Sequence, residues 1–349
     1  MHWTLQRSLV TLSACVFLAV YPTTLIAEEA SGMAGILAQI QKTPHDPNPL
    51  GAFPAQLLRH KEYKAPFQLR QYQSLDGTPL AAAMGIHRDG KPHPGVVLAH
   101  GFIETKNQKY IVELSALLYQ NGWHVLAIDF RGHGDSRKLS QAPITFGWKE
   151  ADDILAGAKF LRDEAKPTSI ATLGFSMGGR SVVKAMIKDG GQLLQAWIAL
   201  SGPIAEPDPV LPPDPKVVLS PVERFFLGYL GAPSFYDYWE KAANHYGVTR
   251  QVLESEQRAD TAIAQVKAPL LMVYALDDFL WLAQLKRGRH EGERYSLRYR
   301  DAVKDHPYVA TLLVDRGNHA GLLYLSDPHW FGTIVMTYLQ YCRPVRPIM

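Results

Sequence analysis

Six short apolar runs, separated by segments of helical periodicity, constrain the fold of this chain more than any other feature. The runs lie at 95–100, 123–129, 169–175, 196–202, 269–275 and 308–315. Each is close to continuously apolar, as strands are when both faces of a parallel sheet are covered. The helical segments lie at 109–122, 150–165, 180–191 and 330–342. This alternation predicts a doubly wound α/β sheet, mostly parallel, with helices on both faces.

One proline-rich segment interrupts the alternation. Seven of the residues in 203–221 are proline, which excludes regular structure there. We therefore expect 203–262 to be an insertion after the sixth strand (196–202, with 95–100 counted as the third), leaving 67–202 and 263–349 as the core. Residues 28–66 are mixed in composition and contain prolines, and we expect them to form an arm leading to that core.

The composition excludes several classes of protein. With 47% hydrophobic and 20% charged residues, the chain is neither disordered nor embedded in a membrane throughout. Its 36 Lys+Arg and 33 Asp+Glu are scattered, so no nucleic-acid partner is expected. Cys15 and Cys342 are the only cysteines, and we expect no intramolecular disulfide after export. Cys342 lies on an apolar helical stripe and is expected to act as a small buried hydrophobe.

The first 27 residues resemble a secretory signal. Arg7 precedes the apolar stretch 9–27, and Ala27 stands before two glutamates as a plausible cleavage position. We therefore expect export, to the periplasm or out of the cell. Two alternatives stay open: an uncleaved anchor that associates the protein with a membrane, and a lipid on Cys15, because LSAC (12–15) resembles a lipobox.

Ser176 is a candidate nucleophile. It lies in GFSMG (174–178), between a predicted strand and a predicted helix, and matches G-x-S-x-G. In this motif a sharp turn holds the serine in a strained conformation, and side chains two residues away on either side would collide. That crowding accounts for Gly174 and Gly178. The N-terminus of the following helix would direct N–H groups at an anion near the serine.

A nucleophilic serine needs a base, and the base needs an acid that orients it. For this motif the expected order along the chain is serine, acid, histidine. Asp277 and Asp278 follow one predicted strand, and His319 lies in a short polar loop after the last. Because the carboxyl ends of parallel strands meet at one edge of the sheet, we expect both aspartates and His319 to lie at the same edge as Ser176. His319 is the candidate base, and the spacing leaves both aspartates open as the acid.

Two backbone N–H groups are candidates for an oxyanion hole. One belongs to Met177, directly after the serine, and the other to Phe102 in HGF, where the run 95–100 ends. His100 itself is expected to be a structural loop residue that hydrogen bonds to the backbone.

Taken together, the motifs resemble the α/β-hydrolase superfamily over roughly 70–345, and most closely its serine esterase, lipase and prolyl-aminopeptidase-like branch. They appear in the family's order: HGF (100–102), DFRGHGDS (129–136), GFSMGG (174–179), ALDD (275–278) and GNH (317–319). The resemblance implies that Asp278 is the acid, as the last residue of the family's G-x-x-D, with Ala275 in place of the glycine. It also implies structural roles for Asp129 and His133, and a cap or lid at 203–262.

The implied activity is that of a serine hydrolase which cleaves a small-molecule carboxylic ester through an acyl-enzyme. Ser176 would attack, His319 would take its proton, and Asp278 would orient His319. Eight aromatic residues between 225 and 246 favour an apolar or aromatic acyl group, or else form the insertion's own core. No metal or organic cofactor is expected, because H-E-x-x-H, C-x-x-C and G-x-G-x-x-G motifs are absent from the sequence.

Two other functions remain as alternatives. An aminopeptidase of the prolyl-aminopeptidase type would need acidic groups for a free amine, and Glu223, Asp237 and Glu240 are candidates. A non-catalytic binding protein of the same fold would need no nucleophile, base or acid. The complete set of serine, acid and histidine argues against that reading.

Overall fold

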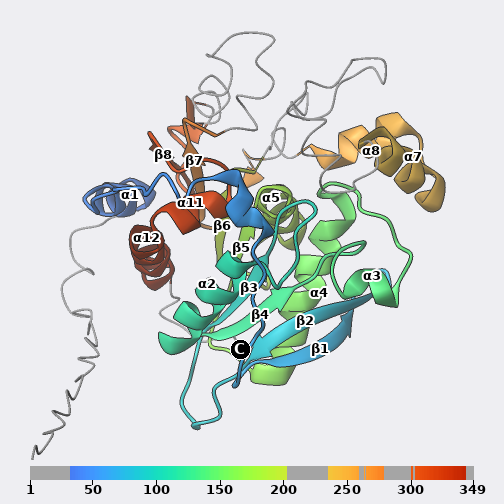
Figure 1. Ribbon diagram of the computed structural model, residues 1–349, viewed down its shortest axis with the longest axis horizontal. Helices are drawn as coiled ribbons and strands as arrows, with labels where there is room; N and C mark the ends of the chain where they lie inside the picture. Colours follow the sequence, from blue (N-terminus) through green and yellow to red (C-terminus); the bar gives the residue numbers. More distant parts are fainter. Residues whose placement is uncertain are drawn as a thin grey trace, which may run out of the picture.

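The structure of the protein is a computed structural model. It describes residues 32–202, 235–258, 263, 265–278, 300–301 and 303–342 (Figure 1). The expectations for 1–27, for most of the insertion and for Glu223 therefore lie outside the described residues, as does the side chain of Asp237. Within the described ranges, no helix combines the length and the apolar character needed to cross a membrane.

A single sheet forms the centre of the described chain (Figure 1). Its eight strands lie in the spatial order β1-β2-β4-β3-β5-β6-β7-β8. In sequence order they are β1 (Gln68–Gln73), β2 (Pro79–Gly85), β3 (Gly95–Ala99), β4 (His124–Ile128), β5 (Ile170–Phe175), β6 (Ala196–Leu200), β7 (Leu270–Ala275) and β8 (Val309–Val314). β2 pairs antiparallel with β1 and with β4, and all the other pairs are parallel. The mostly parallel α/β sheet predicted from the sequence is confirmed.

Helices cover both faces of this sheet. The helices described are α1 (Met33–Gln41), α2 (Lys109–Gln120), α3 (Ser136–Leu139), α4 (Trp148–Ala165), α5 (Met177–Asp189), α7 (Phe235–Tyr246), α8 (Arg250–Gln257), α11 (Gly321–Ser326) and α12 (Pro328–Tyr341), with a 3₁₀ turn at Pro54–Leu58. Side chains of α4 and α5 pack on one face, and those of α1, α2, α11 and α12 pack on the other.

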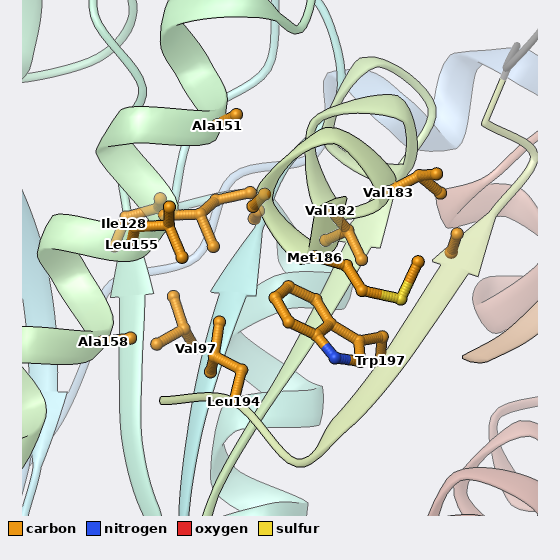
Figure 2. Close-up of a cluster of buried hydrophobic side chains, with 14 of the residues drawn as sticks. Val97, Ile128, Ala151, Leu155, Ala158, Val182, Val183, Met186, Leu194 and Trp197 are labelled. Atoms are coloured by element: carbon orange, nitrogen blue, oxygen red, sulfur yellow. The ribbon is translucent and has the colours of Figure 1, made fainter. Parts of the chain in front are cut away.

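Alternate residues of each central strand point into the two cores. On β3, Val97 packs with Ile128 and Trp197 beneath α4 and α5 (Figure 2). Its neighbours Val96 and Leu98 pack on the opposite face. Because both faces exclude water, the strand has no polar positions, which explains the continuous apolar runs. Strands β1 and β2 precede the six apolar runs. β1 is an edge strand with mostly exposed side chains, and the buried β2 carries three alanines in place of large apolar side chains.

Two parts of the chain outside the sheet also pack against its cores. Within 28–66, helix α1 buries Ile36 and Ile40 in the core beside β8 and α12. Helices α7 and α8 fall between β6 and β7 along the chain, inside 203–262. Their residues Trp239 and Leu253 join the core on the side of α4 and α5, so this part of the insertion packs onto the sheet domain.

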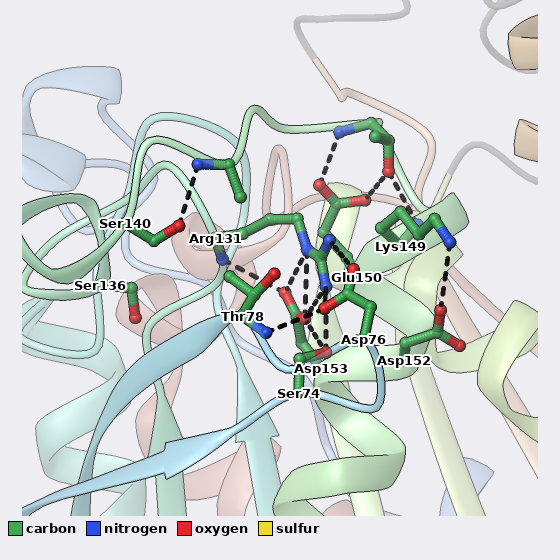
Figure 3. A network of polar contacts seen from close by, with 12 residues as sticks. Ser74, Asp76, Thr78, Arg131, Ser136, Ser140, Lys149, Glu150, Asp152 and Asp153 are labelled. Atoms are coloured by element: carbon green, nitrogen blue, oxygen red, sulfur yellow. Dashed lines mark hydrogen bonds and ion pairs between the residues drawn. The ribbon is translucent and has the colours of Figure 1, made fainter. Parts of the chain in front are cut away.

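Arg131 forms the centre of a buried ionic network in the loop after β4 (Figure 3). Its guanidinium donates to both carboxylate oxygens of Asp153 on α4, to Asp76 at 2.8 Å and to the Tyr246 hydroxyl of α7 at 2.7 Å. Ser74 donates to Asp153 at 2.6 Å. Burial acts to lower the pKa of Arg131, but the charge of Asp153 and the hydrogen bonds to Asp153 and Asp76 together outweigh it, so the pKa is raised. The network thereby joins the β1–β2 turn, the β4 loop, α4 and α7.

We predict that Asp153→Asn destabilises the fold strongly. Removing this charge leaves a fully buried guanidinium undercompensated, which typically costs about 3–5 kcal/mol. The free energy of unfolding in urea measures the loss. Glu164→Gln is the control, because the Glu164–Arg70 pair is partly exposed and should contribute less than about 1 kcal/mol. Equal losses in the two variants would contradict the prediction.

Candidate active site

Ser176 occupies a sharp turn between β5 and α5. Its backbone has φ 52° and ψ −115°, a conformation that side chains rarely adopt. A Cβ on Gly174 would lie 2.2 Å from the carbonyl oxygen of Gly178, and a Cβ on Gly178 would lie 2.5 Å from that of His100. Both glycines are therefore required by contact. The Ser176 N–H donates to the carbonyl of Leu200 on β6 at 2.8 Å, which ties the turn to the neighbouring strand.

A chain of hydrogen bonds runs from the serine through His319 to Asp278. His319 Nε2 lies 2.7 Å from Ser176 Oγ, and Nδ1 lies 2.6 Å from Asp278 Oδ2. Since the buried carboxylate only accepts, Nδ1 carries the proton and Nε2 accepts from the serine hydroxyl. Asp278 is fully buried and His319 is 5% exposed. The three residues lie beyond the C-terminal ends of β5, β7 and β8, where ligands of such sheets bind.

The two aspartates left open by the sequence have different partners. Asp278 contacts the imidazole, whereas Asp277 accepts from the backbone N–H groups of Asn318 at 2.7 Å and Gly317 at 3.3 Å. Asn318 has φ 63° and donates its side-chain amide to the carbonyl of Ala52 at 3.0 Å. Asp277 and the segment containing Ala52 therefore hold the loop that carries His319.

The HGF loop lies directly beside the serine. A Cβ on Gly101 would be 3.3 Å from Ser176 Cβ. His100 Nδ1–H donates to the carbonyl of Gly101 at 2.7 Å, and Nε2 accepts from Phe130 N–H at 3.2 Å. Burial lowers the pKa of His100 well below its ordinary value, so the ring is neutral. The expected backbone-bonding role of His100 is confirmed. Met177 begins α5, next to the serine.

Asp129 and His133 support the same loop from the β4 side. Asp129 accepts from the backbone N–H and from Nζ of Lys106, both at 2.7 Å. His133 Nε2 accepts from the N–H of Ile103 at 3.2 Å, and its Nδ1 donates to the carbonyl of Arg131. Ile103 has φ 56°, so His133 holds a strained residue directly after Phe102. These contacts agree with the structural roles that the resemblance implied.

Sequence reasoning missed Glu104, Tyr110 and Ser201. Glu104 Oε2 accepts from the N–H of Gly101 at 2.7 Å and from the Tyr110 hydroxyl. Ser201 Oγ accepts from the N–H of Ala320, next to His319, at 3.0 Å. No motif marks any of these residues: Ser201 and Ala320 meet only in the folded chain, and the contacts of Glu104 with Gly101 and Tyr110 depend on the conformation of the loop. The available signal for Glu104 was its position three residues after Gly101, which follows a predicted strand; at that spacing its carboxyl group can accept from the Gly101 N–H.

Aromatic side chains lie on the other side of the HGF loop. The Phe102 ring is 5.2 Å from that of Phe146 and 5.5 Å from that of Tyr238 on α7. The contact with Tyr238 is edge-to-face, which is a favourable geometry for aromatic pairs. Within the described ranges, no three His, Cys, Asp or Glu side chains are grouped so as to hold a metal ion.

Comparison with known proteins identifies relatives for this fold. The family model for serine aminopeptidase, S33, matches residues 90–232, a range that contains Phe102 and Ser176 but ends before Asp278 and His319. No curated protein matches the chain.

Solved structures of hydrolases resemble the chain over most of its length. The Pf2001 esterase of Pyrococcus furiosus is 19% identical with a TM-score of 0.56, over 84% of this chain and 95% of that one. The 2,6-dihydroxy-pseudo-oxynicotine hydrolase is 17% identical with a TM-score of 0.54, over 81% and 71%. Est1E from Butyrivibrio proteoclasticus is 16% identical with a TM-score of 0.51, over 78% and 96%. Together with the sheet order, these likenesses show that the chain has the α/β-hydrolase fold.

Proposed function

We propose that the protein is a serine hydrolase that cleaves a carboxylic ester through an acyl-enzyme. The observation that carries this proposal is the hydrogen-bonded chain from Ser176 Oγ through His319 to the buried Asp278. The match to serine aminopeptidase and the likeness to two esterases and a further hydrolase support a hydrolase of this type.

In the first half of the reaction, Ser176 Oγ attacks the ester carbonyl while His319 Nε2 takes the hydroxyl proton. The imidazolium that forms keeps its hydrogen bond to the Asp278 carboxylate, which holds the ring in the required tautomer and orientation. His319 then gives the proton to the departing alkoxide. The product is an ester between Ser176 and the acyl group.

The carbonyl oxygen becomes negatively charged during the attack. We assign the N–H groups of Met177 and Phe102 to this oxyanion, one from the start of α5 and the other from the loop beside Ser176 Cβ. The positive end of the α5 dipole adds to the stabilisation. Water then attacks the acyl-enzyme with His319 again as the base, and the free acid leaves.

An apolar or aromatic acyl group fits the surroundings of the site. The oxyanion loop itself presents the Phe102 ring, which packs with Phe146 and Tyr238. Est1E, which shares the fold, has been solved with ferulic acid, an aromatic acid, bound. We therefore propose that Tyr238, and with it the 203–262 insertion as a cap, contacts the acyl group.

An aminopeptidase is the second candidate, and the S33 match favours it. A free amine would need a carboxylate at the site that is available to the substrate. In the described part of the site, Asp278 contacts His319, Asp277 contacts the His319 loop, and Glu104 contacts Gly101 and Tyr110. Glu240 lies on α7 and is exposed to solvent. We favour the ester because the carboxylates nearest the serine already have protein partners.

The protein is also proposed to act outside the cytoplasm. This rests on residues 1–27, whose charge and apolar stretch are typical of an export signal. Retention of this segment as a membrane anchor and lipidation at Cys15 are alternative outcomes of the same export.

We predict that a fluorophosphonate probe labels the purified protein and that Ser176→Ala abolishes labelling and esterase activity together. The probe reports a serine activated by its neighbours, so it needs no knowledge of the natural substrate. Intact-protein mass spectrometry measures the adduct. Labelling that persists in the Ser176→Ala variant would exclude Ser176 as the nucleophile.

Asp278→Asn is expected to lower kcat by about 10⁴-fold, because the amide no longer fixes the His319 tautomer. Asp277→Asn should lower it by about tenfold or less, since that carboxylate contacts only backbone N–H groups of the loop. Steady-state hydrolysis of a p-nitrophenyl ester separates the two. A larger loss of kcat in Asp277→Asn than in Asp278→Asn would identify Asp277 as the acid that orients His319.

Tyr238→Ala is expected to change acyl preference and leave the chemistry intact. Loss of an aromatic contact with the acyl group corresponds to about a 2- to 10-fold lower kcat/KM for p-nitrophenyl esters of long or aromatic acids, relative to the acetate. Glu240→Ala, an exposed position of the same helix, is the control. An unchanged ratio in the Tyr238 variant would remove this residue from the acyl site. Aminoacyl-arylamides assayed in parallel test the aminopeptidase alternative.

A further inference from the structure

We propose that Glu104 is a positioning residue for the oxyanion hole: it fixes the Gly101–Phe102 loop so that the Phe102 N–H faces the reacting carbonyl. The proposal rests on the assignment of Ser176 and Phe102 to the active site of a serine hydrolase. It adds a residue that takes no part in the proton transfers between Ser176, His319 and Asp278.

Glu104 and Ser176 both lie close to Gly101. A Cβ on Gly101 would be 2.5 Å from Glu104 Oε2 and 3.3 Å from Ser176 Cβ, so glycine, carboxyl and serine are packed against one another. No side chain fits at position 101 between the other two. A movement of the Glu104 carboxyl would therefore be transmitted to Gly101 and to the amide that follows it.

One carboxyl oxygen closes the turn. Oε2 accepts from the Gly101 N–H at 2.7 Å, while the Glu104 N–H approaches the Gly101 carbonyl at 3.4 Å. The segment 101–104 is thus held from both ends, around Ile103 with its strained φ of 56°. Strain of this kind persists only when surrounding contacts over-determine it. The Gly101–Glu104 contacts supply that restraint within the turn itself.

Tyr110 fixes the carboxyl in turn. Its hydroxyl, on the first turn of α2, donates to the same oxygen, Oε2. Tyr110 is 1% exposed and Glu104 is 7% exposed, so water competes little for these bonds. Burial raises the pKa of Glu104, and the bonds from Tyr110 and Gly101 act to lower it. Oε2 accepts both bonds whether or not the carboxyl is ionised, so the positioning does not depend on its charge.

The peptide group that contains the Phe102 N–H and the peptide group after it are also restrained. His100 binds the Gly101 carbonyl and His133 binds the Ile103 N–H, at 2.7 and 3.2 Å. Glu104 adds the Gly101 N–H, so three side chains hold consecutive backbone groups of the loop. Donors fixed before the reaction stabilise an oxyanion without the cost of reorganisation.

The test compares two conservative variants of Glu104. Glu104→Gln keeps the length of the side chain and an oxygen that accepts both bonds, and removes the charge. Glu104→Asp keeps the charge but is one methylene too short to reach both Gly101 and Tyr110. Glu164→Asp, at a partly exposed ion pair on α4, is the matched control for the shortening.

Positioning predicts that Glu104→Asp lowers kcat for a p-nitrophenyl ester by about 10- to 100-fold with KM nearly unchanged, because only transition-state stabilisation is lost. The rate constant of fluorophosphonate labelling should fall in parallel. Glu104→Gln should stay within about threefold of the unmodified protein in both measurements. Thermal unfolding of each variant shows that the protein is folded under the assay conditions.

The inference is overturned if the Gln variant loses as much kcat as the Asp variant, or if neither differs from the unmodified protein. If Glu104→Asp does not fold, Tyr110→Phe replaces it: this variant removes one bond to Oε2, and a kcat equal to that of the unmodified protein overturns the proposal. Failure of the proposed function is a different result, because the unmodified protein would then be neither labelled nor active.

Discussion

The reversal of the backbone at Ser176 is the constraint on which the rest of the site depends. With φ at 52°, the chain passes from β5 into α5 within one residue, and Gly174, Gly178 and the HGF loop are pressed together around it. In this conformation the serine hydroxyl faces His319, and α5 begins at the next residue, Met177. The strain is held by the two layers of the fold, since β5 is buried on both sides by neighbouring strands and helices.

Buried polar contacts position the loops around this turn. The His319 loop is held by Asp277, the HGF loop by His100, His133 and Glu104, and the β4 loop by the Arg131 network. Loops have no ladder of backbone bonds of their own, so their geometry follows from such contacts. The chemistry proposed for Ser176 therefore depends on residues that take no part in the proposed proton transfers.

The sequence predicted the parts of the molecule that repeat a local pattern. Continuous apolar runs marked the parallel strands because burial on two faces removes every polar position, whereas the exposed edge strand β1 carried no such signal. The G-x-S-x-G turn marked Ser176 because its steric requirement is local. Asp277 and Asp278 could not be separated by position alone, since the difference lies in which one faces His319. Glu104 was missed for a different reason: its partners Gly101 and Tyr110 are close along the chain, but no known motif marks the turn that brings them together.

The contact between Asn318 and Ala52 joins a segment that precedes the sheet to the loop that carries His319. The segment 48–52 lies beside α11, with Asn48 N–H bonded to the Ser326 carbonyl and Ala52 carbonyl bonded to the Asn318 side chain. The segment 48–52 is therefore attached to the core at the His319 loop, one residue from His319. A recombinant protein begun after residue 60 would keep all the residues that touch the serine and lose this attachment.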